Sequence, residues 1–329
     1  MTTSRTGRLV TTLVIVAVVA SGCFGSDPRN LLDSIRDGSV VLGTKFDQPG
    51  LGIRNADESV TGFDPAVSTF VVARIADSLG VSEPRSRWRE TPSTQRETLI
   101  DNGQVDMIAA TYSITPERAE EVDFAGPYLV NYQGLLVRAD DESITTLTDL
   151  DEGKTLCSVT GSTSAQNVTA QLPSVQLEEY DTASSCVEAL RRGRVDALTT
   201  DEVILAGYEN RYPGEFTLVD MTYPTDACVD GTLKRAGTPF STERYGIGLG
   251  AGQSETVTAV NEALVTMMEP TADGRSPWER ALRDAIGDAQ VDRMIARAAE
   301  PGSPFDFTPD PGDLDFLEET TVPCETEPR

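Results

Sequence analysis

Short apolar runs alternate along the chain with stretches whose apolar residues recur every three or four positions. The apolar runs are typical of buried strands, and the longer periodic stretches are typical of helices. The predicted strands are 39–45, 105–109, 154–159, 175–177, 195–198 and 244–250. The predicted helices are 65–80, 94–102, 164–172, 182–192, 202–208, 255–268, 278–286 and 290–299. Strands that alternate with helices in this way predict an α/β fold with parallel sheets.

The alternation falls into two blocks, which the segment 131–139 separates. We therefore expect two lobes, each a sheet covered by helices, with the chain leaving the first lobe and later returning to it. The predicted division is 39–136 plus 242–299 for lobe 1 and 137–241 for lobe 2. Two strands that cross between lobes make a hinge. Within lobe 2, 222–238 has the turn-rich composition of an inserted loop, and 300–329 is an acidic, proline-rich tail that we expect to be extended.

The first residues are typical of an export signal. Residues 1–8 hold two arginines and no acid, and 9–20 are apolar but too few to span a bilayer. Ala20-Ser21-Gly22-Cys23 follows and resembles a bacterial lipobox, so we expect 1–22 to be removed and Cys23 to carry lipid. The polar residues 23–38 would then be a linker, and the protein would sit on the extracytoplasmic face of the cell membrane. The alternative is an ordinary signal peptide followed by an unrelated cysteine.

The other four cysteines are Cys157, Cys186, Cys228 and Cys324. An even number in an oxidising compartment predicts two disulfides, and four cysteines allow three pairings. We favour Cys157–Cys186, which closes a short loop, and Cys228–Cys324, which ties down the tail. The competing interpretation is a metal site of four thiolates, which the absence of a C-x2-C pair makes less favourable.

Charge excludes several classes of function. The 329 residues include 27 Lys and Arg against 53 Asp and Glu, a formal charge of −26, which argues against nucleic-acid binding. The chain has no histidine, which removes His-based catalytic triads and imidazole metal sites. We expect no cofactor. Only three lysines are present, so a carboxylate ligand is most readily met by arginine, whose planar fork binds it through two hydrogen bonds.

Two polar segments follow predicted strands and a third lies at a strand end, which is where open α/β folds bind ligands. They are 110–118, 160–164 and 196–201. Arg118 and the backbone N–H groups of a helix beginning at 161–164 suit a carboxylate, and Asp201 suits an ammonium group. The hydroxyls of Thr111, Ser113 and Thr163 add hydrogen-bond donors. Together these groups match the two charged ends of an amino acid.

Longer stretches carry a resemblance to a known family. The motifs are GFD at 62–64, ITPER at 114–118, DFAGPY at 123–128, TGSTS at 160–164 and VDALTTD at 195–201. In this order they resemble the solute-binding proteins of amino-acid importers of the ABC type and, among these, the glutamate-binding lipoproteins of actinobacteria. The resemblance covers 39–221 and 239–298, and it implies a type II periplasmic-binding-protein-like fold that closes over its ligand. Pro65 and Ala66 depart from the pattern, which usually has an apolar residue and a second acid there.

The resemblance also implies roles for individual residues. Asp201 would bind the ligand ammonium, and Arg96 with Lys45 would meet a side-chain carboxylate, which favours glutamate. The α-carboxylate would be held by Arg118 with the help of Ala110, Thr111, Ser113, Gly161 and Thr163. Some of these residues have a simpler interpretation. Arg96 could pair with Glu97 or Asp101 on a helix surface, and Arg118 with Glu117 or Glu121. Thr160–Ser164 could be a capped loop, and Asp201 could cap a helix.

The expected function is that of a receptor, not an enzyme. It would bind L-glutamate and deliver it to the permease and ATPase subunits of an importer. The first alternative is the same role for glutamine, aspartate or asparagine. The second is a sensory ligand-binding module acting on a partner. An enzyme on the same fold would need a general acid and base, and the sequence offers no convincing pair.

Overall fold

The computed structural model describes residues 27–151, 153–229, 231–318 and 322–324. Its helices are α1 (Leu31–Arg36), α2 (Phe63–Leu79), α3 (Arg96–Asp101), α4 (Pro116–Ala119), α5 (Thr163–Gln171), α6 (Ala183–Arg191), α7 (Glu202–Arg211), α8 (Ser254–Met268), α9 (Pro277–Ile286) and α10 (Asp288–Ala299). Three short 3-10 helices are η1 (Ser93–Gln95), η2 (Leu147–Asp151) and η3 (Asp315–Glu318). The predicted signal peptide and Cys23 lie outside the described residues. None of the described helices is long and apolar enough to cross a membrane.

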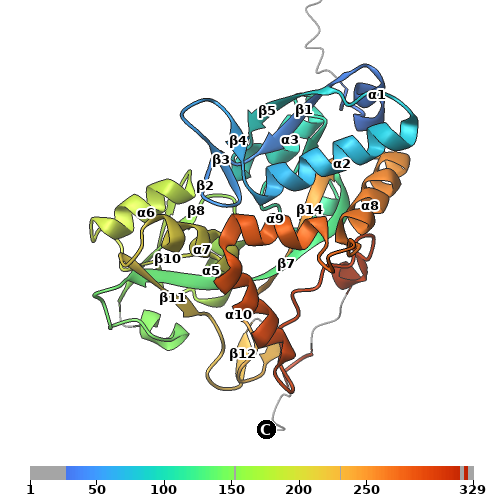
Figure 1. The fold of residues 1–329 in the computed structure, drawn as a ribbon. Coiled ribbons are helices and arrows are strands. Elements are labelled where there is room, and N and C mark those ends of the chain that lie inside the picture. Colours follow the sequence, from blue (N-terminus) through green and yellow to red (C-terminus); the bar gives the residue numbers. More distant parts are fainter. Residues whose placement is uncertain (1–26, 152, 230, 319–321, 325–329) are drawn as a thin grey trace, which may run out of the picture.

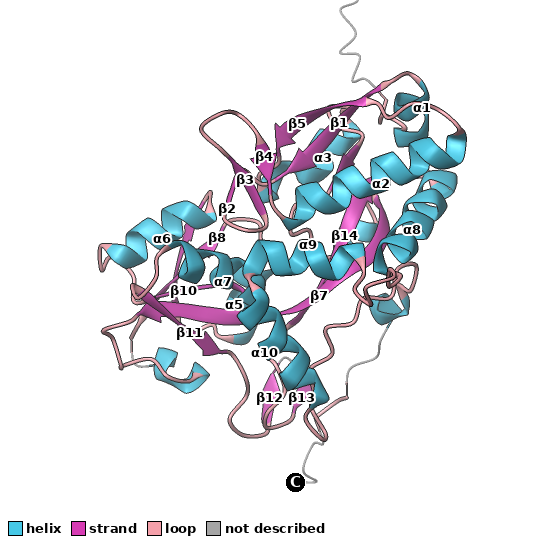
Figure 2. Ribbon diagram, in the orientation of Figure 1, coloured by secondary structure: helices cyan, strands magenta, loops and turns pink. Residues whose placement is uncertain are grey.

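A nine-stranded sheet organises the described residues. Its strands are β1 (Ser39–Thr44), β5 (Arg85–Glu90), β6 (Met107–Ile108), β7 (Asp123–Arg138), β8 (Thr155–Val159), β9 (Gln176–Tyr180), β10 (Ala197–Asp201), β11 (Phe216–Asp220) and β14 (Thr242–Leu249). Smaller pairings join β2 (Asp47–Gln48), β3 (Gly52–Arg54) and β4 (Val60–Thr61), and β12 (Ala227–Val229) with β13 (Thr232–Lys234). Figure 2 shows helices on both sides of the sheet, which is the predicted α/β arrangement.

The long strand β7 joins two halves of this sheet. Its residues 123–132 pair with β14, and its residues 133–138 pair with β10 and β11. We call the part with β5, β1, β6 and β14 the first half, and the part with β10, β8, β9 and β11 the second half (Figure 1). The lobe boundaries given above remain a prediction, which the change of partners after Tyr132 supports.

The predicted elements form for the physical reasons that the sequence suggests. In α2, Phe63, Val67, Val71 and Ile75 recur every four residues and are buried in the main core. Gly80 ends the helix in the left-handed conformation that glycine adopts readily. Two helices of the second half, α5 and α6, begin with side-chain caps: Ser162 accepts a hydrogen bond from the backbone N–H of Ala165, and Thr182 from that of Ser185.

The prediction of a polar linker is wrong over residues 31–36, which form α1. Leu31, Leu32 and Ile35 are buried against the main core, and Asn30 caps the helix by accepting from the N–H of Asp33. The single apolar face of so short a helix is hidden in sequence by the polar residues around it. The chain is therefore anchored to the first half from residue 31 onward.

Both predicted disulfides are present, which contradicts the interpretation of the four cysteines as a metal site. Cys157–Cys186 joins β8 to α6 inside the second half, and both residues are buried. Cys228–Cys324 joins the hairpin β12–β13, within the predicted inserted loop, to the end of the tail.

The tail follows α10 and packs along the rest of the molecule. Phe305 and Phe307 contact the ring of Tyr132 edge-on, with centroids 4.8 and 5.1 Å away. Further on, Leu314 and Phe316 pack against the cluster of apolar residues around Tyr112 and Phe124 in the first half.

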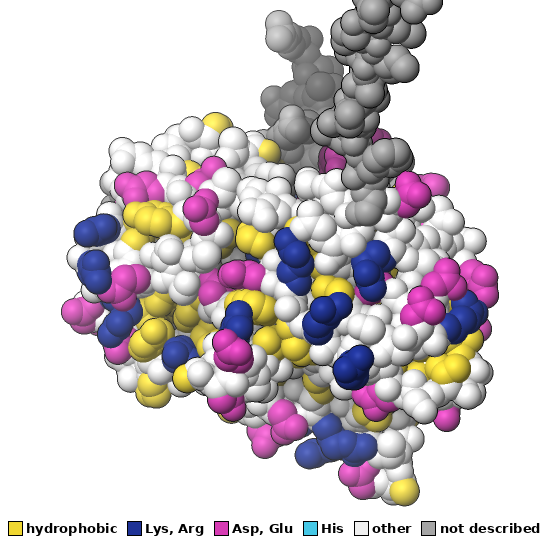
Figure 3. Space-filling model, turned by 90° about the horizontal axis from the view of Figure 1, so that it is seen from above, with side chains coloured by type: hydrophobic (Ala, Val, Ile, Leu, Met, Phe, Trp, Pro, Cys, Tyr) yellow, Lys and Arg dark blue, Asp and Glu magenta, His cyan; other side chains and the backbone are white. Residues whose placement is uncertain are grey.

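The acidic excess is not gathered into one surface in the view of Figure 3. Acidic and basic side chains are interspersed on that face, with apolar side chains between them.

Candidate functional site

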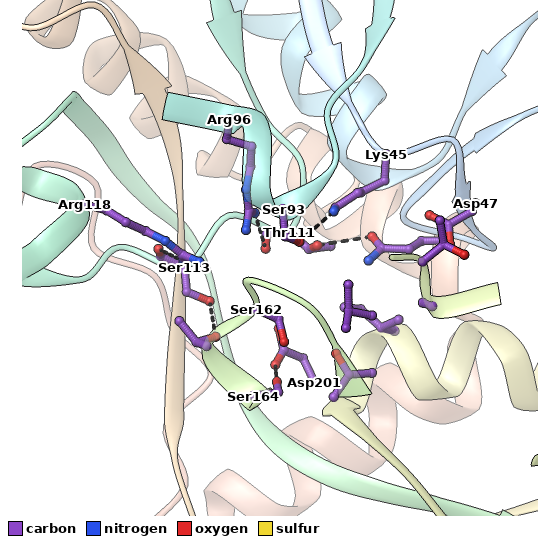
Figure 4. Close-up of a pocket in the computed structure, with 17 residues that line it drawn as sticks. Lys45, Asp47, Ser93, Arg96, Thr111, Ser113, Arg118, Ser162, Ser164 and Asp201 are labelled. Atoms are coloured by element: carbon purple, nitrogen blue, oxygen red, sulfur yellow. Dashed lines mark hydrogen bonds between the residues drawn. The ribbon is translucent and has the colours of Figure 1, made fainter. Parts of the chain in front are cut away.

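A pocket lies between the two halves. Its lining from the first half is Lys45, Asp47, Gln48, Ser93, Arg96, Thr111, Ser113 and Arg118. Its lining from the second half is Val159, Ser162, Thr163, Ser164, Thr182, Ala183, Thr200, Asp201 and Ile204. Figure 4 shows the basic side chains on one side of the pocket and Asp201 on the other. Seven of the nine residues predicted to bind ligand are in this lining. The carbonyls of the other two, Ala110 and Gly161, accept hydrogen bonds from Arg96 and Arg118.

Arg96 is a buried guanidinium that makes no ion pair among the described residues and lies over the ring of Tyr112, 4.2 Å from its centroid. It begins α3, is 2% exposed, and donates through Nη1 to the carbonyls of Ala110 and Thr111 at 3.3 and 3.4 Å, near the upper limit for a hydrogen bond. Its Nε has no hydrogen bond there. Burial, and then the charge of Arg118, lower the pKa of Arg96 to about 10. The interpretation of Arg96 as a surface residue is therefore wrong.

Lys45 is the second buried cation on this side. It follows β1, and its Nζ donates to Oγ of Ser93 at 2.8 Å. Burial, and then the charge of Arg96, lower the pKa of Lys45 to about 7. Two buried cations this close repel each other, so an anion bound beside them would be strongly stabilised.

Arg118 reaches across the pocket to the second half. Thr115 caps α4 and Pro116 opens it, which places Arg118 in the first turn with only 9% of its surface exposed. Its Nη1 donates to the carbonyl of Ser113 at 2.7 Å and its Nη2 to the carbonyl of Gly161 at 3.1 Å. The ion pair that it makes is with Glu97 at 3.6 Å, not with Glu117 or Glu121. A guanidinium has five N–H groups, so donors remain for a carboxylate.

Asp64 fixes the backbone beside the cations. Thr111 has a φ of 46°, which is uncommon for a residue with a branched side chain. The fully buried carboxylate of Asp64 accepts from the N–H of Thr111 at 2.8 Å and from the hydroxyl of Tyr128 at 2.7 Å. Burial raises the pKa of Asp64 to about 6. The Asp of the GFD motif thus holds the wall of the pocket and does not itself line it.

Asp201 faces the pocket from the end of β10. It occupies the position before α7, but its side chain makes no capping hydrogen bond. Instead, its carboxyl oxygens accept from Oγ of Ser164 at 3.2 Å and from the hydroxyl of Tyr245. Burial, and then the charge of Glu243, raise the pKa of Asp201. A buried carboxyl group with this surplus of negative charge suits an ammonium ligand.

Thr163 differs from its expected role as a hydroxyl donor to ligand. Its Oγ1 donates its one proton to Oε2 of Glu243 at 2.7 Å. What remains for an anion is the start of α5, where the first-turn N–H groups other than that of Ala165, which Ser162 caps, have no partner within the helix.

The sequence analysis missed Glu243 and Tyr245. Both lie on β14 two positions apart, hence on one face of the strand, and both reach Asp201 or Thr163 in the second half. The predicted strand, 244–250, begins one residue after Glu243, so no signal in the sequence showed that the two side chains share a face or reach the pocket.

Comparison with known proteins identifies the group to which the chain belongs. Residues 40–273 match the family model of the bacterial extracellular solute-binding proteins, family 3. The chain belongs to this family. This solute-binding protein is similar over almost its whole length to the glutamate-binding protein GluB of Corynebacterium efficiens. The two are 48% identical over 318 residues, which is 96% of this chain and 98% of that protein.

More distant relatives of this solute-binding protein share its fold. The glutamine-binding protein GlnH of Bacillus subtilis is 30% identical, over 81% of this chain and 92% of that protein. Among solved structures, an ancestral arginine-binding protein bound to glutamine matches with a TM-score of 0.61 and 27% identity, over 76% of this chain and 99% of that one. A solute receptor for L-cysteine of Neisseria gonorrhoeae matches with a TM-score of 0.65 and 25% identity, over 80% and 96%. The predicted periplasmic-binding-protein-like fold is confirmed.

Proposed function

We propose that this solute-binding protein binds L-glutamate in the pocket between its halves and delivers it to an ABC importer. The observation that carries the proposal is the uneven charge of the pocket, with Lys45, Arg96 and Arg118 on one side and Asp201 on the other. Two carboxylates and one ammonium group, the charges of glutamate, complement this arrangement. The 48% identity to a glutamate-binding protein over almost the full chain gives independent support.

The charges also favour an orientation of the ligand. The ammonium group lies at Asp201, the α-carboxylate at Arg118 and the first turn of α5, and the side-chain carboxylate at Arg96 and Lys45. Glutamine would present a neutral amide to Arg96 and Lys45, and would leave two buried cations uncompensated, which is unfavourable. Aspartate, being one methylene shorter, would not reach both ends of the pocket at once.

The partners follow from the same proposal. Ligand contacts from both halves favour the closed arrangement, which then presents one continuous surface to the permease. The lipid on Cys23 holds the protein at the extracytoplasmic face of the membrane. Because the chain has a charge of −26, its attraction to anionic lipid is weak, so anchoring depends on the lipid itself.

Titration calorimetry tests the proposal on a soluble form that begins after Cys23. We expect tight binding of L-glutamate and much weaker binding of L-aspartate, L-glutamine and L-asparagine. A preference for glutamine would retain the receptor role but would contradict the assignment of Arg96 and Lys45. Binding of none of the four would contradict the proposal.

The importer role is tested in cells. We expect glutamate uptake to fall when the protein is removed, and to recover with the wild type but not with Cys23→Ala. Unchanged uptake after removal would instead favour the sensory module.

A further inference from the structure

The carboxyl group of Asp201 is held by two hydroxyl groups that come from different halves of the molecule. Ser164, in the first turn of α5, donates from Oγ to Oδ1 at 3.2 Å. Tyr245 donates from its hydroxyl to Oδ2. Ser164 belongs to the second half, as Asp201 does, whereas Tyr245 lies on β14, which pairs with residues 123–132 of β7 in the first half. All three residues are buried.

The packing of Tyr245 fixes where its hydroxyl lies. Its ring is fully buried beside that of Tyr128, with centroids 6.1 Å apart, and its backbone pairs with Leu129 of β7. The hydroxyl oxygen accepts a long hydrogen bond of 3.5 Å from Nδ2 of Asn131, so its only proton goes to Asp201. Burial raises the pKa of Tyr245, so the hydroxyl keeps that proton. A tyrosine side chain has few torsions, and a core that holds the ring also holds the donor.

These two donors leave the pocket side of Asp201 available. A carboxylate can accept about four hydrogen bonds, and the two hydroxyls use one position on each oxygen. Asp201 lines the pocket and faces its cationic side (Figure 4). The remaining positions therefore suit the N–H groups of an ammonium ion.

Charged groups lie on three of the elements packed around Asp201. Burial raises the pKa of Asp201 to about 8, and Glu243 of β14 adds to this effect. The two hydroxyl donors and Arg118 of α4 act against it, because they favour the ionised form. From α7, Glu202 pairs its own carboxylate with Arg297. Loss of either hydroxyl donor should therefore raise the pH at which Asp201 ionises.

We propose that Tyr245 is a positioning residue for the ligand's ammonium group, because it holds the Asp201 carboxylate across the junction between the halves. This proposal rests on the proposed function and deepens it. Asp201 contacts the ammonium group, and Tyr245, which does not line the pocket, acts only through Asp201. Recognition of the ammonium group is then built from both halves, although only the second half touches it.

The variant Tyr245→Phe tests the proposal, because it removes the hydroxyl and keeps the ring. L-glutamate and glutarate carry the same two carboxylates, but glutarate has no ammonium group. Titration calorimetry should show at least about ten-fold weaker binding of L-glutamate to the variant, and a change of less than about two-fold for glutarate. A general loss of structure would instead weaken the binding of both ligands alike.

The pH profile of binding provides a second readout. In the wild type, ionisation of Asp201 offsets the loss of charge on Lys45 up to about pH 8. Loss of one donor raises the pKa of Asp201 further, so the fall in affinity for L-glutamate should begin at a higher pH in Tyr245→Phe, by at least about 0.5. This readout does not need glutarate, and it decides alone if glutarate binds too weakly to measure.

The matched control is Tyr132→Phe. Tyr132 is a buried tyrosine on the junction strand β7, and its hydroxyl bonds to the backbone of Asp306 in the tail. It does not line the pocket. This variant also loses a buried hydroxyl, so its melting temperature should fall as that of Tyr245→Phe does. Its ratio of L-glutamate to glutarate affinity and its pH profile should match those of the wild type.

A second variant keeps the proposal testable if Tyr245→Phe does not fold. Replacement of Tyr245 by 3-fluorotyrosine keeps both the ring and the hydroxyl, and the electron-withdrawing fluorine makes the hydroxyl a stronger donor. The pKa of Asp201 should then fall, so the decline in affinity for L-glutamate should begin at a lower pH than in the wild type.

The outcomes separate this inference from the proposed function. Equal losses of affinity for the two ligands, or pH profiles that match the wild type, would overturn the role of Tyr245 while L-glutamate binding stands. Failure of the wild type to bind L-glutamate would instead overturn the proposed function.

A second inference rests on a row of arginines along one edge of the sheet. Arg85, Arg87 and Arg89 alternate along β5, so their side chains lie on one face of the strand. Because β5 pairs only with β1, it is the edge strand of the first half. All three arginines are exposed, and none makes an ion pair or a side-chain hydrogen bond within the described residues.

The row ends beside the pocket. In the register of the sheet, Arg89 lies opposite Gly43, so Lys45, two residues further on, continues the same face. With strands about 4.8 Å apart and a rise of about 3.3 Å per residue, the Cα atoms of Arg89 and Lys45 lie about 8 Å apart. Lys45 lines the pocket, and Glu90, the acid of β5, alternates onto the other face of the strand.

We infer that this arginine row draws the anionic ligand towards the pocket, in a molecule whose net charge of −26 otherwise repels it. The Debye length at physiological ionic strength is about 8 Å, so the row acts over the last stage of the approach. The inference rests on the proposed function and concerns the rate at which L-glutamate binds.

Stopped-flow fluorescence tests the row with two variants of equal net charge. The first is Arg87→Gln, Arg89→Gln. The control is Arg194→Gln, Arg211→Gln, which changes two exposed arginines of the second half that make no ion pair within the described residues. We expect the first variant to lower the association rate constant of L-glutamate about two-fold at low ionic strength and to match the wild type near 1 M salt. Its dissociation rate constant should not change, and the control should stay close to the wild type throughout.

Equal association rate constants for the two double variants would overturn the role of the row. If the first variant then also lost glutamate uptake in cells, the row would serve a protein partner instead of the ligand. A wild type that does not bind L-glutamate would overturn the proposed function.

Discussion

The ammonium group of Lys45 lies where both burial and a neighbouring cation oppose its charge. Its pKa of about 7 means that Lys45 is charged below about pH 7 and neutral above it in the empty protein. A ligand carboxylate favours the charged form. Burial raises the pKa of Asp201 to about 8, and Asp201 must be ionised to bind the ammonium group, so up to about pH 8 its ionisation offsets the loss of charge on Lys45. Affinity for L-glutamate should therefore fall only as the pH rises above about 8, by up to about ten-fold per pH unit.

The variant Lys45→Arg separates these two effects, because arginine keeps its charge over this range. Calorimetric affinities between about pH 6 and about pH 9 should lose the alkaline decline in the variant and keep it in the wild type. If the two proteins show the same slope with pH, Lys45 does not face the ligand's carboxylate.

Asp64 offers a second prediction at the scale of a residue. Its two carboxylate oxygens each satisfy a buried donor, the N–H of Thr111 and the hydroxyl of Tyr128. Asparagine has one acceptor oxygen, so Asp64→Asn leaves one of these donors without a partner. Urea denaturation should show a free energy of unfolding lower by about 1–3 kcal/mol. The exposed Asp57→Asn is the control, and should change it by less than about 0.5 kcal/mol.

Single residues also show why part of the site was predictable. Arg118 and Asp201 follow strands in recognisable motifs, so their place at the sheet edge could be anticipated. Glu243 was not anticipated, because its contact with Thr163 joins positions 80 residues apart. Likewise, the engagement of the Thr163 hydroxyl by Glu243 depends on a neighbour that only the folded chain brings near.

At the scale of the elements, helix α7 packs closely against the first half of the molecule. A Cβ atom added at Gly207 would lie 2.0 Å from the carbonyl oxygen of Pro49, which belongs to the first half. Tyr208 donates to the carbonyl of Asp47 beside it, at 2.7 Å. The glycine therefore permits a contact between halves that no larger residue allows.

The variant Gly207→Ala should act on the closed arrangement alone. We expect at least about ten-fold weaker binding of L-glutamate, since closure becomes less favourable without loss of a ligand contact. The melting temperature of the ligand-free protein should stay the same or rise, because alanine favours a helix over glycine by about 1 kcal/mol. A lower ligand-free melting temperature would mean that the clash is already present without ligand.

The elements that bury many apolar residues were the ones that the sequence predicted. Helices with a long apolar face, such as α2, were predicted within a few residues, and so were the buried strands β1 and β8. The edge strand β5 was missed, because Arg85, Ser86, Arg87 and Arg89 expose polar side chains and give no apolar run. The short helix α1 was missed for the related reason that its three buried apolar residues make too brief a pattern.

For the whole molecule, net charge and local charge have opposite signs. The chain carries −26 overall, whereas its pocket gathers three cations on one side. L-glutamate is an anion, so it is repelled at long range and attracted only near the pocket. Added salt weakens the long-range repulsion more than the short-range attraction.

The association rate constant of L-glutamate should therefore rise between low and physiological ionic strength, which stopped-flow fluorescence can measure. A zwitterion such as L-glutamine, where it binds at all, should show little change. A rate for L-glutamate that falls with salt would indicate that the pocket's cations dominate the approach.

The Cys228–Cys324 disulfide also changes how the molecule would bear mechanical force. It closes a covalent ring over a sequence separation of 96, and this ring contains β14 and α8 to α10 but not β7. Tension applied at the two ends would pass from one cysteine to the other and bypass the ring. A pulled oxidised molecule would thus extend by about 320–345 Å less than one without this bond. Of the two strands that pair along the junction between the halves, β7 would carry the load and β14 would stay slack.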